Sequence, residues 1–183
     1  MNETDGLDQW QNDLKVFGIC SFSLSEKNNI LENPLMWSHY AEEHKGVCLF
    51  YQFPTNFINY DRNNIFGISK VEYKENPLTD WFINNAEEYD SLDLIKFLFK
   101  LGPKTLTIKS PPWEYEEEVR MVRPKKGFLK IEKEFLKQIC FGLNTPDEDK
   151  KLIIKIVSDS NYQVTFCEAI HGESDFGLTI REI

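Results

Sequence analysis

The sequence lacks several features that would each assign a protein to a class. No apolar run approaches the ~20 residues that a membrane-spanning helix needs, and residues 1–14 are polar and acid-rich, unlike a secretory signal. Basic residues are also in deficit, because 21 Lys and Arg stand against 30 Asp and Glu and give a formal net charge of −9. We therefore expect a cytoplasmic protein without a membrane partner, for which nucleic acid is a disfavoured partner.

Spacings typical of metal sites are missing as well. Four cysteines lie far apart in apolar, strand-like stretches, and no CxxC or Cys/His cluster joins them: Cys20, Cys48, Cys140 and Cys167. We expect buried, reduced thiols and no metal ion. One local basic patch remains a candidate, made of Lys104, Lys109, Arg120, Arg123, Lys125 and Lys126. Its alternative is an ordinary solvated face.

What the sequence does contain is enough apolar bulk for a folded core. Hydrophobic residues make up 41% of the 183 positions and aromatic residues 14%, which excludes wholesale disorder and fits one domain. Short alternating strands are mixed with helices, without regular βαβ spacing. We predict a flexible lead-in over residues 1–15 and a single α+β domain over 16–183, with a mixed, largely antiparallel sheet and flanking helices.

Local patterns predict the strands. Alternation along the sequence favours strands at 16–24, 118–123, 162–166 and 176–180. Further strands are predicted at 65–73, 127–131 and 138–141. The nearly continuous apolar run at 46–53 is instead typical of a central strand that is covered on both faces.

Capping residues predict the helices. Asn33 as N-cap and Pro34 in the first turn favour a helix from 34 to about 45, which Gly46 would end. A helical apolar pattern covers 78–101. Thr145 is expected to cap a further helix.

A first polar–aromatic cluster lies on the predicted helix 34–45. Trp37, Tyr40 and His44 fall on one stripe of that helix, and His39 points elsewhere. The two histidines differ by ~140° in direction, so they do not readily share a metal ion. We predict Trp37, Ser38, Tyr40 and His44 as ligand contacts and His39 as a general base. The alternative for either histidine is a hydrogen-bonded core residue.

A second cluster covers residues 109–120. If 116–120 are extended, Glu116, Glu118 and Arg120 project from one face, with neighbours ~7 Å apart along the strand. Two carboxylates and a guanidinium can bind a ribose diol, position a nucleophile or stabilise a cationic transition state. We predict these three residues as catalytic. The alternative is an exposed acidic edge with one structural ion pair.

Aromatic and basic residues accompany that face. Trp113 and Tyr115 could stack on a base or on a nicotinamide ring, and with Lys109 they complete the predicted ligand-binding set. The helix that carries Trp37 and His39 is expected to form the opposite side of the same site.

Both clusters carry a family resemblance. Met36-Trp-Ser-His-Tyr-Ala, then His44-Lys-Gly and an apolar strand, resembles the first signature of a bacterial family named domain of unknown function 2971. The run from Lys109 through Trp113-x-Tyr-Glu-x-Glu-x-Arg120 resembles its second signature. The serine-rich strand 20–25 and the turn 139–142 match too, so the resemblance extends from about residue 17 to the C-terminus.

Family members usually carry a further N-terminal segment of tyrosine-rich and Asn-Asp-Pro-containing strands. The resemblance therefore implies a shortened member, a fragment, or a chain whose missing strands come from a partner. The family layout is also similar, more loosely, to the ADP-ribosyltransferase superfamily, where a polar residue, a serine strand and a late glutamate surround NAD. On that likeness Glu118 is the late glutamate, and Trp113 or Tyr115 packs on the nicotinamide.

These observations leave two classes of function open. One is an NAD-using transferase or glycohydrolase, a toxin or phage-defence effector in which Glu118 is essential. The other is a non-enzymatic module that senses a nucleotide-like ligand, or that pairs with a partner chain or a second copy through an uncovered sheet edge. A nuclease that uses His39 or His44 with Glu116 is disfavoured by the lack of a general basic surface.

Overall fold

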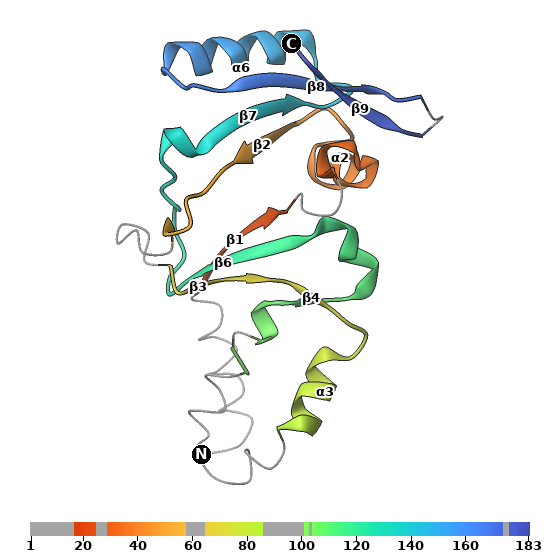
Figure 1. Ribbon diagram of the computed structural model, residues 1–183, viewed down its shortest axis with the longest axis vertical. Coiled ribbons are helices and arrows are strands. Elements are labelled where there is room, and N and C mark those ends of the chain that lie inside the picture. Colours follow the sequence, from red (N-terminus) through yellow and green to blue (C-terminus); the bar gives the residue numbers. More distant parts are fainter. Residues whose placement is uncertain (1–16, 25–28, 58–64, 86–100, 103, 174–175) are drawn as a thin grey trace. The chain divides into compact units, whose positions relative to one another are not determined.

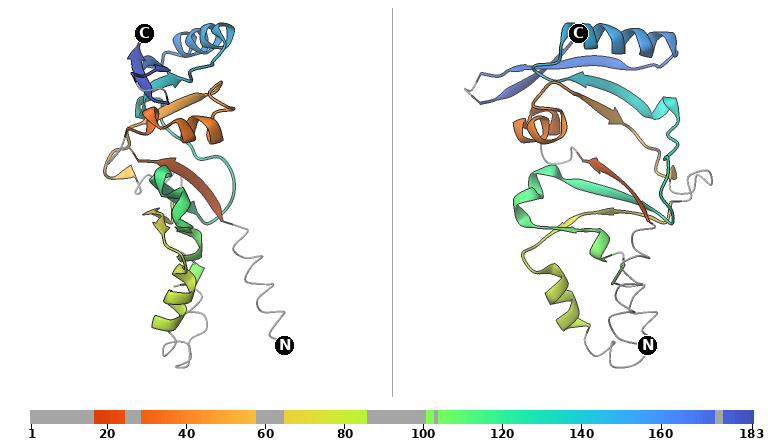
Figure 2. Two further views of the ribbon diagram at one scale, coloured as in Figure 1. Left: turned by 90° about the vertical axis from the view of Figure 1, so that its right-hand side faces the viewer. Right: turned by 180° about the vertical axis from the view of Figure 1, so that it is seen from behind.

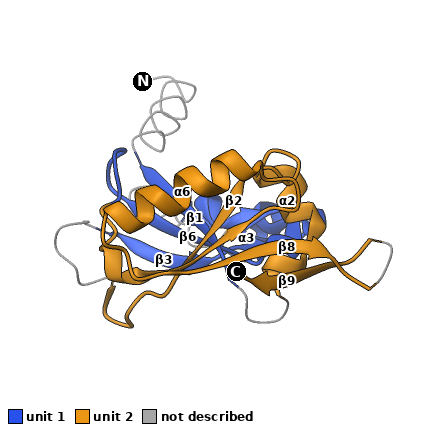
Figure 3. Ribbon diagram, turned by 90° about the horizontal axis from the view of Figure 1, so that it is seen from above, with its two compact units in different colours: residues 1–24, 58–129 blue, residues 25–57, 130–183 orange. Residues whose placement is uncertain are grey.

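The computed structural model describes residues 17–24, 29–57, 65–85, 101–102, 104–173 and 176–183. The chain forms two compact units, each assembled from two separate stretches, as the colours in Figure 3 show. Unit 1 consists of Met1–Leu24 and Ile58–Leu129, and unit 2 of Ser25–Phe57 and Lys130–Ile183. The predicted lead-in 1–15 lies outside the described residues, and the assignment of 16–183 to a single domain stays a prediction.

Unit 1 is built on a three-stranded antiparallel sheet in the order β1-β6-β3 (Figure 1). Its strands are β1 (Gly18–Ser23), β6 (Glu118–Arg123) and β3 (Gly67–Lys70). The central strand β6 buries Val119 and Met121, which is the face that the alternating sequence predicts. Because β6 is paired on both sides, its backbone is fixed along its length and can hold functional side chains in place.

Short elements surround the start of β6. Strands β4 (Glu72–Tyr73) and β5 (Ile108–Lys109) pair in parallel, and α3 (Pro77–Asn84) follows β4. The 3₁₀ helix η3 (Pro111–Glu116) begins at two prolines, whose fixed φ suits a first turn. Glu117 then adopts a left-handed conformation with φ 45°, which ends η3 and turns the chain into β6.

Unit 2 contains a four-stranded sheet in the order β2-β7-β8-β9. Its elements in chain order are η1 (Ile30–Glu32), α2 (Pro34–Tyr40), β2 (Val47–Tyr51), η4 (Lys133–Phe135), β7 (Leu136–Phe141), α6 (Asp147–Asp159), β8 (Thr165–His171) and β9 (Leu178–Glu182). The pair β7–β8 is parallel and is joined through α6, which runs alongside β8 in Figures 1 and 2.

The sheet of unit 2 has a helix on each face. Trp37 of α2 clusters with Cys140 and Cys167, whereas Val157 of α6 clusters with Ile139 and Phe141. Neighbouring residues of β7 point to opposite faces, so one strand contributes to both clusters. The strand–helix mixture and the largely antiparallel pairing confirm the predicted α+β class.

The cysteines of the chain are free. Cys140 and Cys167 are buried, as expected, while Cys20 and Cys48 are half-buried. Burial raises the pKa of Cys48 to about 11, so its thiol stays protonated at neutral pH.

Several element predictions were wrong in informative ways. Helix α2 ends at Tyr40 and not near residue 45, because Glu42, Glu43 and His44 all have positive φ. Strand β2 lies at the edge of its sheet and not at its centre, and Leu49 and Phe50 are each 45% exposed.

Other corrections concern the second half of the chain. Residues 127–131 form no strand, and the predicted strand 65–73 is divided between β3 and β4. Thr145 does not cap α6: its hydroxyl donates to the Gly46 carbonyl at 3.0 Å, and Pro146 occupies the cap position. None of the helices in the described ranges has the length and apolar character that crossing a bilayer requires.

Candidate functional site

Glu118 and Arg120 form the centre of a polar cluster in unit 1. They are two residues apart on β6, so their side chains leave the strand on the same face. Arg120 Nε donates to Glu118 Oε1 at 2.8 Å and Arg120 Nη2 donates to Oε2 at 3.0 Å, a bidentate pair. Glu118 is only 7% exposed, so the pair holds a carboxylate that is almost excluded from solvent.

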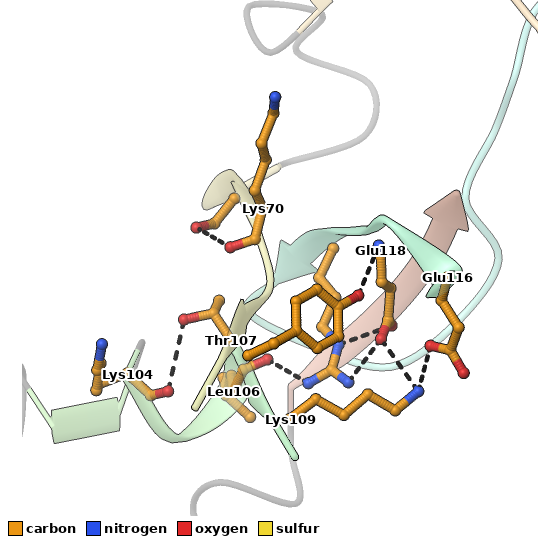
Figure 4. A network of polar contacts seen from close by, with 10 residues as sticks. Lys70, Lys104, Leu106, Thr107, Lys109, Glu116 and Glu118 are labelled. Atoms are coloured by element: carbon orange, nitrogen blue, oxygen red, sulfur yellow. Dashed lines mark hydrogen bonds and ion pairs between the residues drawn. The ribbon is translucent and has the colours of Figure 1, made fainter. Parts of the chain in front are cut away.

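Lys109 of β5 joins a second carboxylate to this pair. Its ammonium bonds the Glu116 carboxylate and lies 3.5 Å from Glu118 Oε2, between the two acids in Figure 4. Glu116 is 2% exposed. Buried charges are stable only when they are paired, and here two cations face two carboxylates. The cluster is therefore close to neutral as a whole.

Backbone contacts fix the cluster from two further segments. Arg120 Nη1 donates to the Leu106 carbonyl at 2.7 Å, and the Glu118 amide donates to the Tyr73 hydroxyl at 2.8 Å. The Glu118 carbonyl accepts from the Val71 amide at 2.8 Å. Both ends of the Glu118–Arg120 pair are thus held by residues that lie before β6 in the chain, which limits the positions that the side chains can take.

The surroundings keep Glu118 ionised. Burial raises the pKa of its carboxyl, but hydrogen bonds from Arg120 and Ser21, with the charges of Arg120 and Lys109, outweigh burial and hold the pKa below its ordinary value. The neighbouring Tyr73 hydroxyl has a raised pKa, first because of burial, so it stays protonated. The cluster therefore presents a carboxylate at neutral pH, and not a carboxylic acid.

An aromatic pair from η3 lies beside the charges. Lys109 Nζ is 4.7 Å from the centroid of the Trp113 ring, within cation–π range. The Trp113 and Tyr115 ring centroids are 6.1 Å apart with a tilt of 35°. Burial, followed by the Glu116 charge, raises the pKa of Tyr115. Trp113 thus lies beside the Lys109 ammonium and Tyr115 lies beside Trp113, while the ligand-binding role of both residues stays a prediction.

The predicted strand face of Glu116, Glu118 and Arg120 is confirmed for Glu118 and Arg120 and is wrong for Glu116. Glu118 and Arg120 share a face, but Glu116 lies in η3 and not on an extended strand. The left-handed Glu117 breaks the alternation, and Lys109 brings Glu116 back to Glu118. The alternative of an exposed acidic edge is contradicted by the burial of both glutamates.

Sequence reasoning missed three members of the cluster: Tyr73, Ser21 and the Leu106 carbonyl. Ser21 could have been found, because antiparallel pairing places it opposite Arg120. Tyr73 and the Leu106 carbonyl contact the cluster from segments that are distant in sequence, so no short sequence motif could have predicted them.

The α2 cluster in unit 2 is organised differently. Trp37 is 3% exposed, belongs to the core, and donates through Nε1 to the Leu31 carbonyl at 2.7 Å. Ser38 Oγ donates to the Pro34 carbonyl at 2.9 Å and lies 3.1 Å from His44 Nε2. Since a hydroxyl has one proton to give, Ser38 donates to only one of these two neighbours at a time.

The other predicted residues of this cluster are a half-buried histidine after α2 and two exposed side chains on α2. His44 Nδ1 is buried, and among the described residues it has no hydrogen-bond partner. His39 and Tyr40 are exposed, with ring centroids 6.5 Å apart. The ligand-binding and general-base roles of these residues stay predictions. So does their pairing with the Glu118 face, which belongs to the other unit.

In the described segments, no group of three or more His, Cys, Asp or Glu side chains has a geometry that could hold a metal ion. The carboxylates of Glu116 and Glu118 form ion pairs with Lys109 and Arg120.

Residues 36–121 match the model of a family described as protein of unknown function (DUF2971). The match confirms the family resemblance, over a narrower span than the predicted one from residue 17 to the C-terminus. It begins at Met36 in α2 and ends at Met121 in β6, so it contains both predicted clusters, although Ser21 of the Glu118 cluster lies outside it. No curated protein and no solved structure matches the chain.

Proposed function

We propose that the Glu118 cluster binds NAD and cleaves the bond between nicotinamide and ribose. The observation that carries this proposal is a carboxylate that is buried, yet kept ionised by Arg120 and Lys109, beside an aromatic pair. Cleavage of a glycosidic bond develops positive charge on the sugar, and a fixed carboxylate stabilises that charge best where solvent is scarce.

The proposed reaction assigns a role to each side chain. The bond from ribose C1′ to the ring nitrogen breaks, its electron pair returns to the ring, and neutral nicotinamide leaves. Glu118 stabilises the oxocarbenium ion that forms. Water, or a nucleophilic group of an acceptor, then adds at C1′ and gives up a proton, for which Glu116 is the nearby base. Arg120 positions Glu118.

Lys109 supports the choice of substrate. Its ammonium lies against the Glu116 and Glu118 carboxylates and over the Trp113 ring. The nicotinamide ring of NAD is also cationic, so it would find the same three partners on displacing the lysine. Loss of the ring's charge on cleavage would weaken that contact and favour release of nicotinamide.

The test is nicotinamide release from NAD by the purified protein. Glu118→Gln should remove the activity, because the amide keeps the size of the side chain and loses its charge. Glu168→Gln is a matched control: Glu168 is also paired with two cations, Lys150 and Arg181, and its pKa is also lowered, first by the Lys150 hydrogen bond. Equal activity of wild type and Glu118→Gln would refute the assignment.

A role as toxin or phage-defence effector is the cellular form of the same proposal. Loss of NAD halts metabolism, so expression of the wild-type chain should lower cellular NAD and arrest growth. Glu118→Gln, expressed to the same level, should do neither. Growth arrest by both forms would separate toxicity from this site.

A second candidate function, partner binding without catalysis, is favoured by the edge strand β2. Strand β2 pairs with β7 on one side only, and Leu49 and Phe50 on it are each 45% exposed. An added strand from a partner could complete the edge. If NAD raises the melting temperature of the protein but is not cleaved, the site is a ligand sensor. If the wild-type protein is a monomer and Phe50→Lys leaves its oligomeric state unchanged, the result counts against partner binding through β2.

A further inference from the structure

The predicted basic patch separates into two parts. Three of its residues are neutralised by glutamates, since Lys104 bonds Glu72 while Lys109 and Arg120 bond the Glu116–Glu118 pair. The other three are Arg123, which ends β6, and Lys125 and Lys126, which lie just after it and are exposed. Phe128 next to them is 99% exposed. Residues 125–129, here named the Phe128 loop, thus place a bare aromatic ring beside two lysines.

The backbone of the Phe128 loop is held by contacts with β6 and β1. Arg123 Nη1 donates to the Phe128 carbonyl at 2.6 Å. A Cβ at Gly18 of β1 would lie 2.7 Å from the Lys125 carbonyl oxygen, so the strand and the loop pack backbone against backbone. Gly127 has φ +135°, which L side chains rarely adopt. The backbone that carries Phe128 is therefore held by its neighbours, and its ring projects into solvent.

Helix α6 carries a surface of complementary chemistry. Val157 packs towards the sheet, and the outer side exposes Leu152 at 56% and Ile156 at 53%, four residues apart on one face. Four exposed charged residues lie near this pair at one-turn spacing, three of them acidic and one basic: Glu148, Asp149, Asp159 and Lys155. We name Glu148, Asp149, Leu152, Ile156 and Asp159 the Leu152 face.

We propose that the Phe128 loop of one copy of the chain docks on the Leu152 face of a second copy. An aromatic ring beside two lysines then meets an apolar pair whose rim holds three carboxylates and one lysine. The hydrophobic patterns match, and the net charges of the two rims are opposite. A membrane or a nucleic acid would also attract lysines, but the net charge of −9 opposes an extended polyanion more than a small local contact.

This contact is head-to-tail, because the two surfaces on each copy are different. Copies can therefore add in a ring or in an open chain. One ring and a few charges bury a small area, so we expect weak association that rises with protein concentration and falls with added salt.

Paired charge reversals give the sharpest test. Variant A is Lys125→Glu with Lys126→Glu, and variant B is Glu148→Lys with Asp149→Lys. Each alone places like charges across the contact, so sedimentation velocity should show a monomer where wild type associates. In a mixture, the loop of A meets the face of B and the loop of B meets the face of A. Association should then return to about the wild-type level.

Single substitutions complete the test. Phe128→Ser should weaken association by about tenfold or more. Phe176→Ser is the matched control, since Phe176 is 90% exposed but lies in an acidic stretch after Glu173, and it should leave association unchanged. A wild-type monomer at every concentration would overturn the proposal, as would an A and B mixture that stays monomeric. Lys125- and Lys126-dependent binding to phosphatidylserine vesicles or single-stranded DNA by a monomeric wild type would assign the loop to another partner.

Discussion

The Glu118 cluster and the α2 cluster look alike in the sequence and differ in the structure. Both mix aromatic residues with acids, bases and a serine or histidine. Around Glu118, side chains from η3, β5 and β6 converge, and two carboxylates are nearly excluded from solvent. On α2, one Ser38–His44 contact forms, Trp37 packs in the core, and His39 and Tyr40 are exposed.

The difference shows how burial distinguishes a polar cluster whose side chains are held in fixed positions from one whose side chains are exposed on a helix. An exposed polar side chain is satisfied by water and needs no particular neighbour. A buried carboxylate must be met by cations and donors at defined positions. Glu118 is met by Arg120 and Lys109, together with Ser21. Such a preorganised charge is what stabilisation of a transition state requires.

The largest expected effect is on folding stability, from removal of Arg120. Arg120→Met leaves the Glu118 carboxylate buried with its bidentate partner gone, and this should cost about 3 kcal/mol or more of unfolding free energy. Arg181→Met is the control, because that arginine is 61% exposed in its pair with Glu168 and should cost about 1 kcal/mol or less. Urea denaturation measures both. Equal losses of unfolding free energy in Arg120→Met and Arg181→Met would contradict the proposed difference between buried and exposed ion pairs.

Next in size is a backbone effect on the α2 side. A Cβ at Gly142 would lie 2.2 Å from the His44 carbonyl oxygen, which also accepts from the Asn144 amide at 2.9 Å. Gly142→Ala should therefore destabilise the protein by about 1–3 kcal/mol. Gly67→Ala, where nothing lies within 4 Å, should change stability far less. Thermal melting of the two variants compares them, and a harmless Gly142→Ala would show that the turn at 42–46 is not fixed.

A moderate effect is expected from pH. The pKa of Glu118 is lower in the folded than in the unfolded chain, so the folded state binds that proton more weakly. Its stabilising contribution is therefore complete above the ordinary value of 4.5 and is lost as pH falls through the lower folded pKa. Glu118→Gln should lose less unfolding free energy than wild type between pH about 7 and about 3. The same loss in both would mean that Glu118 is not held in its ionised form.

The smallest effect should come from Ser38→Ala. Its two contacts, with the Pro34 carbonyl and His44 Nε2, are exposed, so we expect a loss of about 0.5–1 kcal/mol. The nicotinamide-releasing activity should be unchanged if α2 takes no part in the chemistry. A large fall in activity without a fall in stability would instead support the predicted pairing of the two clusters.

Periodicity and capping predicted the parts of the fold that local chemistry determines. Apolar alternation located β1 and β6, and Asn33 caps α2 as predicted, accepting from the Leu35 amide at 3.0 Å. The shared face of Glu118 and Arg120 follows from strand geometry alone.

The wrong predictions concern segments whose structure is determined by contacts with distant residues or by uncommon backbone angles. An apolar run such as β2 can be an edge strand, because apolarity does not tell which strands lie beside it. The positive φ of Glu42, Glu43 and Glu117 is uncommon for glutamate and cannot be read from composition. Thr145 prefers the Gly46 carbonyl, which lies far away in sequence, over the end of its own helix.

The central claim is that an ionised, buried Glu118 cleaves NAD. The most direct measurement is the rate of nicotinamide release by wild type, Glu118→Gln and Glu168→Gln, with folding of each checked by circular dichroism. We predict release by wild type and by Glu168→Gln, and none by folded Glu118→Gln. No release by folded wild type, or equal release by all three, would contradict the claim.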